Sequence, residues 1–138
     1  MYRKAELTDL GCIYDALRGL EQYAKQYSWT NTVDFDKAYL AIDLEIRAGK
    51  AYIVEGYLVM TEVVTPWYST DKVLQEWLVL KLYKQGTVES VPEALLIIAK
   101  ELGCKSVISA DSSPVNIVGR AYEKAGWLPL TKSFTKGI

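Results

Sequence analysis

Histidine does not occur among the 138 residues of this sequence, and its absence narrows the chemistry that the chain can perform. Without an imidazole, triads that contain histidine, histidine general bases and most zinc sites are excluded. Any proton transfer must therefore use a carboxylate, a tyrosine, a lysine, a cysteine or water.

Glu76 is the carboxylate best placed for such a role. It lies in Val73–Tyr83, the longest strand candidate, where period-two alternation puts it on one face with Leu74, Leu78, Leu80 and Leu82. Burial of that face would disfavour the ionised carboxyl and make Glu76 a candidate general base. The structural alternative is that Glu76 lies at a water-filled notch or pairs with a lysine or arginine.

The two cysteines are weaker candidates. Cys12 falls in the apolar stripe of a predicted helix, and Cys104 follows the helix-ending Gly103. Both fit small buried hydrophobic residues in a reducing compartment. A nucleophilic role for Cys104 needs a nearby base, and the sequence names none.

A phosphate site is suggested by the turn after the long strand. Ser90-Val91-Pro92-Glu93 has the form of a capping box, and the helix it starts has Ala94, Leu95, Ile98, Ala99 and Leu102 on its buried side. A strand that leads through Gln85 and Gly86 into a helix start directs N–H groups and a positive dipole end outward, which suits phosphate. The element is equally complete without a ligand.

The first half of the chain supplies the framework. Tyr2–Leu7 predicts an edge strand, and Thr8 or Asp9 can cap a helix with Leu10, Ile13, Tyr14, Leu17, Leu20, Ala24 and Tyr27 along one stripe. Asp34 predicts a second helix cap, followed by the stripe Ala38, Tyr39, Ile42 and Ile46 and a stop at Gly49. Ala51–Val54 and Tyr57–Val64 read as antiparallel strands around a tight Glu55-Gly56 turn.

The remaining segments repeat the strand and helix alternation. Ser106–Ala110 predicts a short buried strand, and Ser113, Pro114 and Gly126 delimit a helix over Val115–Ala125. Trp127–Phe134 can add a strand, which Pro129 restricts to an edge or a bulge. Trp67 and Tyr68, in the loop Thr65–Lys72, are either core plugs or the wall of a binding cleft.

The composition predicts one globular domain over residues 1–138, present as a monomer or a homodimer. Sixteen Lys and Arg against 17 Asp and Glu give no global field for nucleic acid or an anionic membrane. The start of the chain lacks an apolar signal core, and no apolar run approaches a membrane span. We therefore expect a cytoplasmic location, with no nucleic acid and no membrane among the partners.

Over nearly its whole length, this order of elements resembles the acetyl-coenzyme A dependent GNAT acyltransferases. The likeness rests on Tyr2-Arg3-Lys4-Ala5, on Ala94-Leu95-Leu96 through Glu101-Leu102-Gly103-Cys104, and on Asn116 placed six residues before Tyr122-Glu123-Lys124-Ala125-Gly126-Trp127. The resemblance implies an α/β (α+β) fold with a mixed, mostly antiparallel twisted sheet flanked by about four helices.

The function implied by the resemblance is transfer of an acetyl group from acetyl-coenzyme A to an amine of a small molecule or a protein, without a covalent enzyme intermediate. Glu76 would be the base and Tyr122 the acid that protonates the leaving thiolate. For Tyr122 the alternative is simple packing at the domain edge. The resemblance places the coenzyme against Leu78, Val79, Leu80, Gln85, Gly86, Ser90 and Asn116.

One departure from the family pattern keeps a second function open. The family favours Arg or Gln, two residues, Gly, one residue, then Gly or Ala before the helix, whereas this chain has Thr87, Ser90 and Pro92 there. The aromatic loop and the Phe134-Thr135-Lys136 ending resemble small bacteriophage members. The alternative is thus a catalytically silent GNAT-fold interaction protein, either a virion component or a binder of a host protein, located in the virion or the host cytoplasm.

Overall fold

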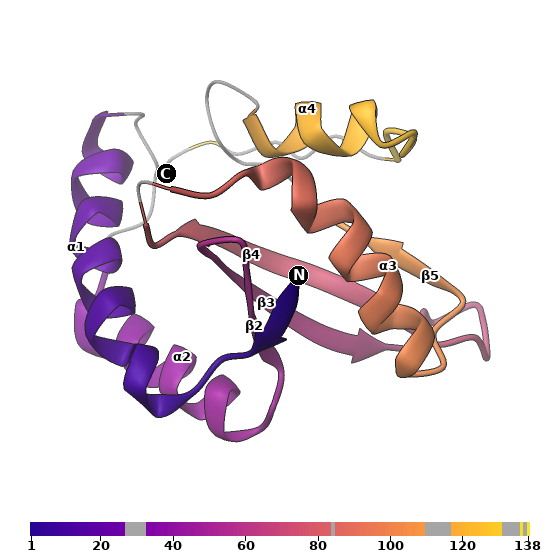
Figure 1. Ribbon diagram of the computed structural model, residues 1–138, viewed down its shortest axis with the longest axis horizontal. Coiled ribbons are helices and arrows are strands. Elements are labelled where there is room, and N and C mark those ends of the chain that lie inside the picture. The colour runs from indigo at the N-terminus through magenta and orange to yellow at the C-terminus, as the bar shows by residue number, and fades with distance from the viewer. Residues whose placement is uncertain (27–32, 84, 110–116, 131–135, 137) are drawn as a thin grey trace.

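The computed structural model describes residues 1–26, 33–83, 85–109, 117–130, 136 and 138 (Figure 1). The five strands are β1 (Tyr2–Lys4), β2 (Ala51–Val54), β3 (Tyr57–Val64), β4 (Val73–Lys81) and β5 (Ser106–Ile108). The helices are α1 (Leu10–Gln26), α2 (Phe35–Arg47), α3 (Val91–Glu101) and α4 (Ile117–Lys124), with 3-10 turns η1 (Leu7–Asp9) and η2 (Val88–Ser90). The sheet has the order β1-β2-β3-β4-β5 and is antiparallel except for β4 and β5, which confirms the predicted mixed α+β architecture.

Helices cover both faces of this sheet, α1 and α2 on one side and α3 on the other (Figure 1). Under α1 and α2, the buried side chains are Ile13, Leu17, Ile42, Ile46, Leu58 and Met60, among others. Under α3 they include Val59, Leu74, Val91, Leu95 and Ile98, with Tyr122 from α4. The helical stripes were predicted correctly where the structure describes them, except that Leu102 follows the last residue of α3 and is exposed.

The β2–β3 hairpin has the predicted turn. Glu55 and Gly56 both have positive φ, 46° and 86°, which is the geometry of a two-residue turn that matches the twist of the strands. The register pairs Val54 with Tyr57 and Ala51 with Met60. The central hairpin is therefore specified locally by its two turn residues.

Three helices end in the same way, each with glycine in the left-handed region at the position after the cap. The second residue past the cap donates its N–H back to the last turn: Lys50 to the Glu45 carbonyl, Cys104 to Ala99, and Trp127 to Tyr122, at 3.0, 2.8 and 3.0 Å. This is the Schellman arrangement. It confirms the helix ends predicted at Gly49, Gly103 and Gly126.

The helix starts agree less well with the prediction. Asp34 caps α2 as expected, because its carboxylate accepts the Lys37 N–H at 3.1 Å. Ser90, however, makes no side-chain capping bond, so the predicted capping box is wrong. The chain already turns at η2, where the Thr87 hydroxyl accepts the Glu89 N–H at 3.2 Å.

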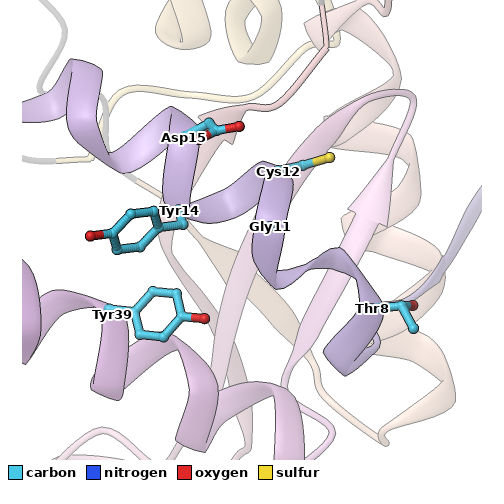
Figure 2. Close-up of a pocket in the computed structure, with 6 residues that line it drawn as sticks. All are labelled: Thr8, Gly11, Cys12, Tyr14, Asp15 and Tyr39. Atoms are coloured by element: carbon cyan, nitrogen blue, oxygen red, sulfur yellow. The ribbon is translucent and has the colours of Figure 1, made fainter.

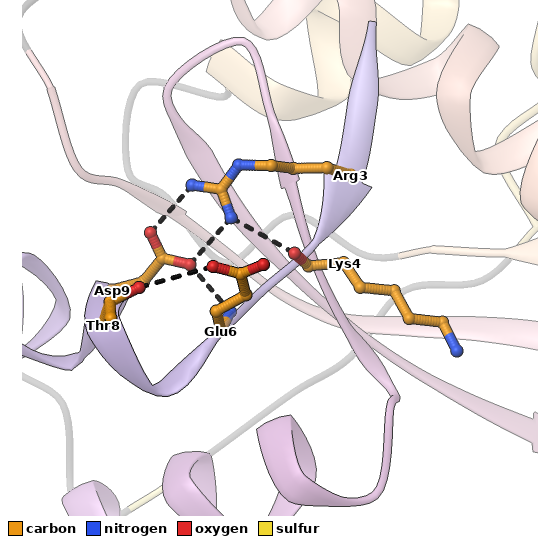
Figure 3. Close-up of polar contacts among 5 residues, drawn as sticks. All are labelled: Arg3, Lys4, Glu6, Thr8 and Asp9. Carbon is orange, nitrogen blue, oxygen red and sulfur yellow. Dashed lines mark hydrogen bonds and ion pairs between the residues drawn. The ribbon is translucent and has the colours of Figure 1, made fainter.

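The start of α1 also differs from the prediction, since neither Thr8 nor Asp9 is the first cap. Glu6 precedes η1, and its N–H donates to Asp9 Oδ2 at 2.8 Å. Arg3 of β1 donates two hydrogen bonds to the same carboxylate, at 2.9 and 2.8 Å (Figure 3). This bidentate pair holds the pKa of the buried Asp9 carboxyl below its usual range and ties the first strand to the first helix.

The face assignment along β4 is corrected by a β-bulge. Thr61 of β3 pairs with Glu76, but Met60 pairs with Leu78, so Trp77 has no partner in the register. Leu74, Glu76 and Val79 consequently face α3 and α4, whereas Leu78, Leu80 and Leu82 pack under α1 and α2. The prediction that Glu76 shares a face with Leu78, Leu80 and Leu82 was wrong, because strict alternation fails at the extra residue.

The C-terminal segments are shorter than predicted where they are described. β5 ends at Ile108 and β4 at Lys81, and Trp127 to Leu130 form no strand. The predicted cap Ser113, the residue Pro114, the candidate Asn116 and the end of the predicted last strand lie outside the described residues. Within the described ranges, no helix is long and apolar enough to cross a membrane.

Candidate active site

Glu76 is at the centre of a buried polar cluster between the sheet and α4. Its side chain is only 3% exposed, and its Oε2 accepts hydrogen bonds from the Tyr122 hydroxyl at 2.9 Å and the Ser109 hydroxyl at 2.8 Å. A buried carboxylate is costly unless polar groups satisfy it, and these two hydroxyls do so. The structure thus brings together the predicted base and the predicted acid, which come from positions 46 residues apart.

Tyr122 is held in this position by the end of its own helix. It is the third residue from the end of α4, and its ring lies 4.5 Å from that of Trp127, centroid to centroid, at an interplanar angle of 32°. A contact between these two positions commonly accompanies a Schellman motif. The Tyr-Glu-Lys-Ala-Gly-Trp sequence therefore fixes the ring so that its hydroxyl points at Glu76.

The cluster lies where the pairing of β4 with β5 ends. β5 pairs with β4 only from Val73 to Gln75, and its last pair joins Gln75 to Ile108. Glu76 is the next residue of β4, and Ser109 is the first residue after β5. Among the described residues, β4 continues from Glu76 to Lys81 without a strand on its β5 side, so backbone groups around Leu78, Val79 and Leu80 are placed to meet an extended ligand.

The turn between β4 and α3 is hydrogen-bonded to the turn of the β2–β3 hairpin. The N–H groups of Leu82 and Tyr83 both donate to the Gly56 carbonyl, at 2.9 and 3.3 Å. Gly86 has φ 139°, and a Cβ added there would lie 1.8 Å from the Glu55 carbonyl oxygen. Gly86 is thus required where this turn crosses the β2–β3 hairpin.

At the helix start beyond this turn, the backbone N–H groups donate to nearby residues of the same segment. The N–H groups of Glu89 and Ser90 donate to the Thr87 hydroxyl and carbonyl, at 3.2 and 3.3 Å, and the Val91 N–H donates to the Val88 carbonyl. Pro92 has no N–H. From Glu89 to Pro92 the backbone therefore keeps no N–H for a phosphate, and Ser90, with φ −78°, is in ordinary helical geometry.

The β4 edge and the turn before α3 differ in the backbone groups that they can offer to coenzyme A. Within the described residues, the β4 edge from Glu76 to Lys81 has no neighbouring strand on its β5 side, and Glu76 at its start bonds Tyr122. The first turn of the α3 region does not offer the set of N–H donors that a diphosphate needs. Gln85, Gly86 and Ser90 stay predictions as coenzyme contacts, and Asn116 lies outside the described residues.

Ser109 was not predicted as a site residue, and one of the two predicted roles of Trp67 and Tyr68 is wrong. Ser109 was not singled out, although a serine directly after a short strand is the only sequence signal it carries. Trp67 and Tyr68 are 96% and 73% exposed and their rings meet edge to face at 5.6 Å, so they are not core plugs. Their predicted alternative, the wall of a cleft, stays a prediction.

A separate hollow of about 620 Å³ opens on the surface of α1 and α2 (Figure 2). Its lining is Thr8, Gly11, Cys12, Tyr14, Asp15 and Tyr39. The Tyr14 and Tyr39 rings meet edge to face at 5.1 Å, while Cys12 hydrogen-bonds the Tyr83 hydroxyl and thereby raises the pKa of that tyrosine. Both cysteines are free thiols and only half-buried, so they are less buried than predicted.

Comparison with known proteins supports the fold. No protein-family profile and no curated protein matches the sequence. Among solved structures, a protein described as a predicted acetyltransferase with acetyl-CoA, from Clostridium acetobutylicum, matches with a TM-score of 0.67 and 15% identity over 99% of this chain and 95% of that one. A GNAT family acetyltransferase from Staphylococcus aureus matches at 0.60 and 11% identity, covering 100% and 98%.

A third similar structure carries a different description. It is a transcriptional regulator from Bacillus halodurans, with a TM-score of 0.65 and 18% identity over 100% of this chain and 99% of that one. At these identities the similarity concerns the fold alone. The chain therefore has a GNAT-like fold, and its activity must be argued from its own residues.

Proposed function

We propose that this protein is an N-acetyltransferase that moves an acetyl group from a thioester, acetyl-coenzyme A, to an amine of a small molecule or a protein. The observation that carries the proposal is the hydrogen bond between Tyr122 and Glu76, buried where the pairing of β4 with β5 ends. A buried carboxylate next to a phenol supplies both a proton acceptor and a proton donor within one contact. Glu76 lies on β4, the strand that the GNAT resemblance makes the expected donor strand, and Tyr122 reaches it from α4.

The chemistry balances with these two residues. The amine nitrogen attacks the thioester carbonyl carbon, so that an N–C bond forms and the C–S bond breaks. Glu76 takes the proton that the amine loses, and Tyr122 gives its hydroxyl proton to the leaving thiolate. The proton on Glu76 then crosses the 2.9 Å contact to the Tyr122 oxygen, which restores both residues.

The bulge at Trp77 supplies the remaining requirement. Negative charge develops on the carbonyl oxygen during attack, and backbone N–H groups are the usual source of stabilisation. A bulge releases backbone groups from a strand ladder, and this one lies directly after Glu76. The donor carbonyl would thus be polarised next to the residue that accepts the proton.

The direct test measures thiol release from acetyl-coenzyme A with a panel of polyamines, amino-acid amides and peptides, together with calorimetry of the thioester alone. Glu76→Gln should lower kcat/KM by about 100-fold or more. The matched control is Glu62→Gln on β3, a partly exposed carboxylate paired with Lys50 at 2.8 Å, which should leave the rate unchanged. No thiol release together with no binding heat at millimolar thioester would rule the proposal out.

The second candidate is a catalytically silent interaction protein that binds a virion or host protein. It is favoured by the internally bonded helix start and by the exposed aromatic pair Trp67 and Tyr68, residue types that are common at interfaces. Turnover that depends on Glu76 would exclude it. A defined partner captured by the wild type but not by Trp67→Ser, in the absence of turnover, would support it.

A further inference from the structure

We infer that the protein recognises its thioester donor through the pantetheine arm and gains little binding from the diphosphate and nucleotide half of coenzyme A. The inference rests on the proposed acetyl transfer and specifies the donor chemistry: an acetyl group on a pantetheine thiol. Such an arm occurs both in the free coenzyme and on carrier proteins.

The backbone N–H groups at the start of the η2–α3 segment are already hydrogen-bonded within the protein. A helix start binds phosphate when its first N–H groups are unpaired and point outward. Here the N–H groups of Glu89 and Ser90 donate to Thr87, and that of Val91 donates to Val88. Pro92 has no N–H. A diphosphate at this position would have to break these bonds before it could form its own.

The charges around this helix start also disfavour a diphosphate. Glu89 and Glu93 both lie in the first turns of the η2–α3 segment, where carboxylates already stabilise the positive end of the helix dipole. Lys124 of α4 donates to Glu89 at 3.1 Å, so this cation is paired with a carboxylate. Two carboxylates and one paired lysine repel a diphosphate instead of attracting it.

The turn between β4 and α3 is held against the β2–β3 hairpin. Leu82 and Tyr83 are bonded to the Gly56 carbonyl, and Gly86 lies against Glu55 with no room for even a methyl group. The first residues of the turn are therefore bonded to the β2–β3 hairpin and Gly86 packs against it, so a wider phosphate loop would require these contacts to break. By contrast, the β4 edge from Glu76 to Lys81 is open, within the described residues, to an extended arm.

The first experiment compares three ligands on the wild-type protein. We expect kcat/KM for acetyl-coenzyme A and S-acetylpantetheine to agree within about tenfold, because the shared arm supplies most of the binding. We also expect 3′-phospho-ADP, the nucleotide half alone, to give no calorimetric heat and no thermal shift. A preference for the coenzyme above about tenfold, or binding of 3′-phospho-ADP, would overturn the inference while leaving acetyl transfer intact. Turnover of neither thioester would remove the proposed function and the inference with it.

The second experiment alters the charge at the turn. Glu89→Gln removes a carboxylate and frees Lys124, so KM for acetyl-coenzyme A should fall several-fold while that for S-acetylpantetheine stays constant. The matched control is Asp71→Asn, the same change of charge in the exposed loop at the opposite end of β4, which should alter neither KM. An equal response of both donors to Glu89→Gln would contradict the inference.

Discussion

The Tyr122 hydroxyl donates a hydrogen bond of 2.9 Å to Glu76 Oε2 and joins α4 to β4 across the interior. Tyr122→Phe keeps the ring and removes only this donor, so we expect unfolding free energy to fall by about 1–2 kcal/mol. If Tyr122 also protonates the thiolate, kcat should fall by about 100-fold with little change in donor affinity. Denaturant melts and steady-state kinetics measure the two effects separately.

Ser109→Ala is the matched control for this variant, because Ser109 donates to the same oxygen at 2.8 Å. It should cost a similar amount of stability but reduce kcat far less. If both variants lower kcat equally, the Tyr122 hydroxyl only positions Glu76, and the acid is another group.

Trp127→Ala tests whether the helix end positions Tyr122. Loss of the ring contact at 4.5 Å removes the apolar half of the Schellman motif and should destabilise the fold by about 2–4 kcal/mol. We expect near-ultraviolet circular dichroism to report a loosened tyrosine environment, and kcat to fall more than KM changes. Leu128→Ala, at a side chain that is 88% exposed, should change none of these readouts.

Deletion of Trp77 tests the role of the bulge. Because Thr61 already pairs with Glu76 and Met60 with Leu78, removing the extra residue leaves both cores on their present faces. The shortened protein should fold with a small change in Tm and lose acetyl transfer by at least about tenfold, as backbone donors return to the ladder. Deletion of Val79 would also absorb the bulge, but it would shift Trp77 into the position of Leu78 and Leu78 into that of Val79, so it should destabilise the fold far more. Equal stability of the two deletion variants would contradict the register.

Gly86→Ala tests the attachment of the turn to the hairpin. A Cβ at 1.8 Å from the Glu55 oxygen forces the turn to move, so a loss of more than about 2 kcal/mol is expected in urea melts. Gly11→Ala is the control, since no atom lies within 4 Å of a Cβ at that helical position. That variant should gain up to about 1 kcal/mol, and a similar loss at both sites would contradict the prediction.

Asp9→Asn tests the pair between β1 and η1. The folded-state pKa of Asp9 is lowered by Arg3, so its contribution to stability is present above the unfolded pKa of about 3.9 and is lost as pH falls through the lower folded value. The variant should be less stable by about 1–2 kcal/mol at pH 7 and approach the wild type in strong acid. Thermal melts from pH 7 to pH 2 measure this convergence, and Asp15→Asn, at an exposed residue of α1, should parallel the wild type throughout.

Much of the fold could be predicted because its boundaries are local. Gly49, Gly103 and Gly126 end their helices as expected, Asp34 starts one, and Glu55-Gly56 makes the hairpin. Each of these signals depends on residues within one turn. Glu76 was also singled out, with burial as one of two alternatives, because a charge in a long apolar strand is visible without long-range information; the structure shows that it is buried.

The rest depends on contacts between distant residues. Leucines at even positions continue through the bulge, so nothing in the strand itself reveals that Trp77 is skipped; only pairing with β3 does. Ser109 meets Glu76 because the pairing of β4 with β5 ends just before these two residues. The sequence around Ser109 does not indicate this contact. Ser90 looked like a helix cap, but the preceding η2 turn had already begun the helix at Val88.

The pairing of β1 with β2 has a consequence for synthesis of the chain. Tyr2 pairs with Val54 in the register, so β1 cannot pair with β2 until more than fifty further residues have been made. The β2–β3 hairpin, by contrast, can close as soon as it emerges from the ribosome, because its contacts are local. Tyr2–Lys4 should therefore join the sheet after that hairpin has formed.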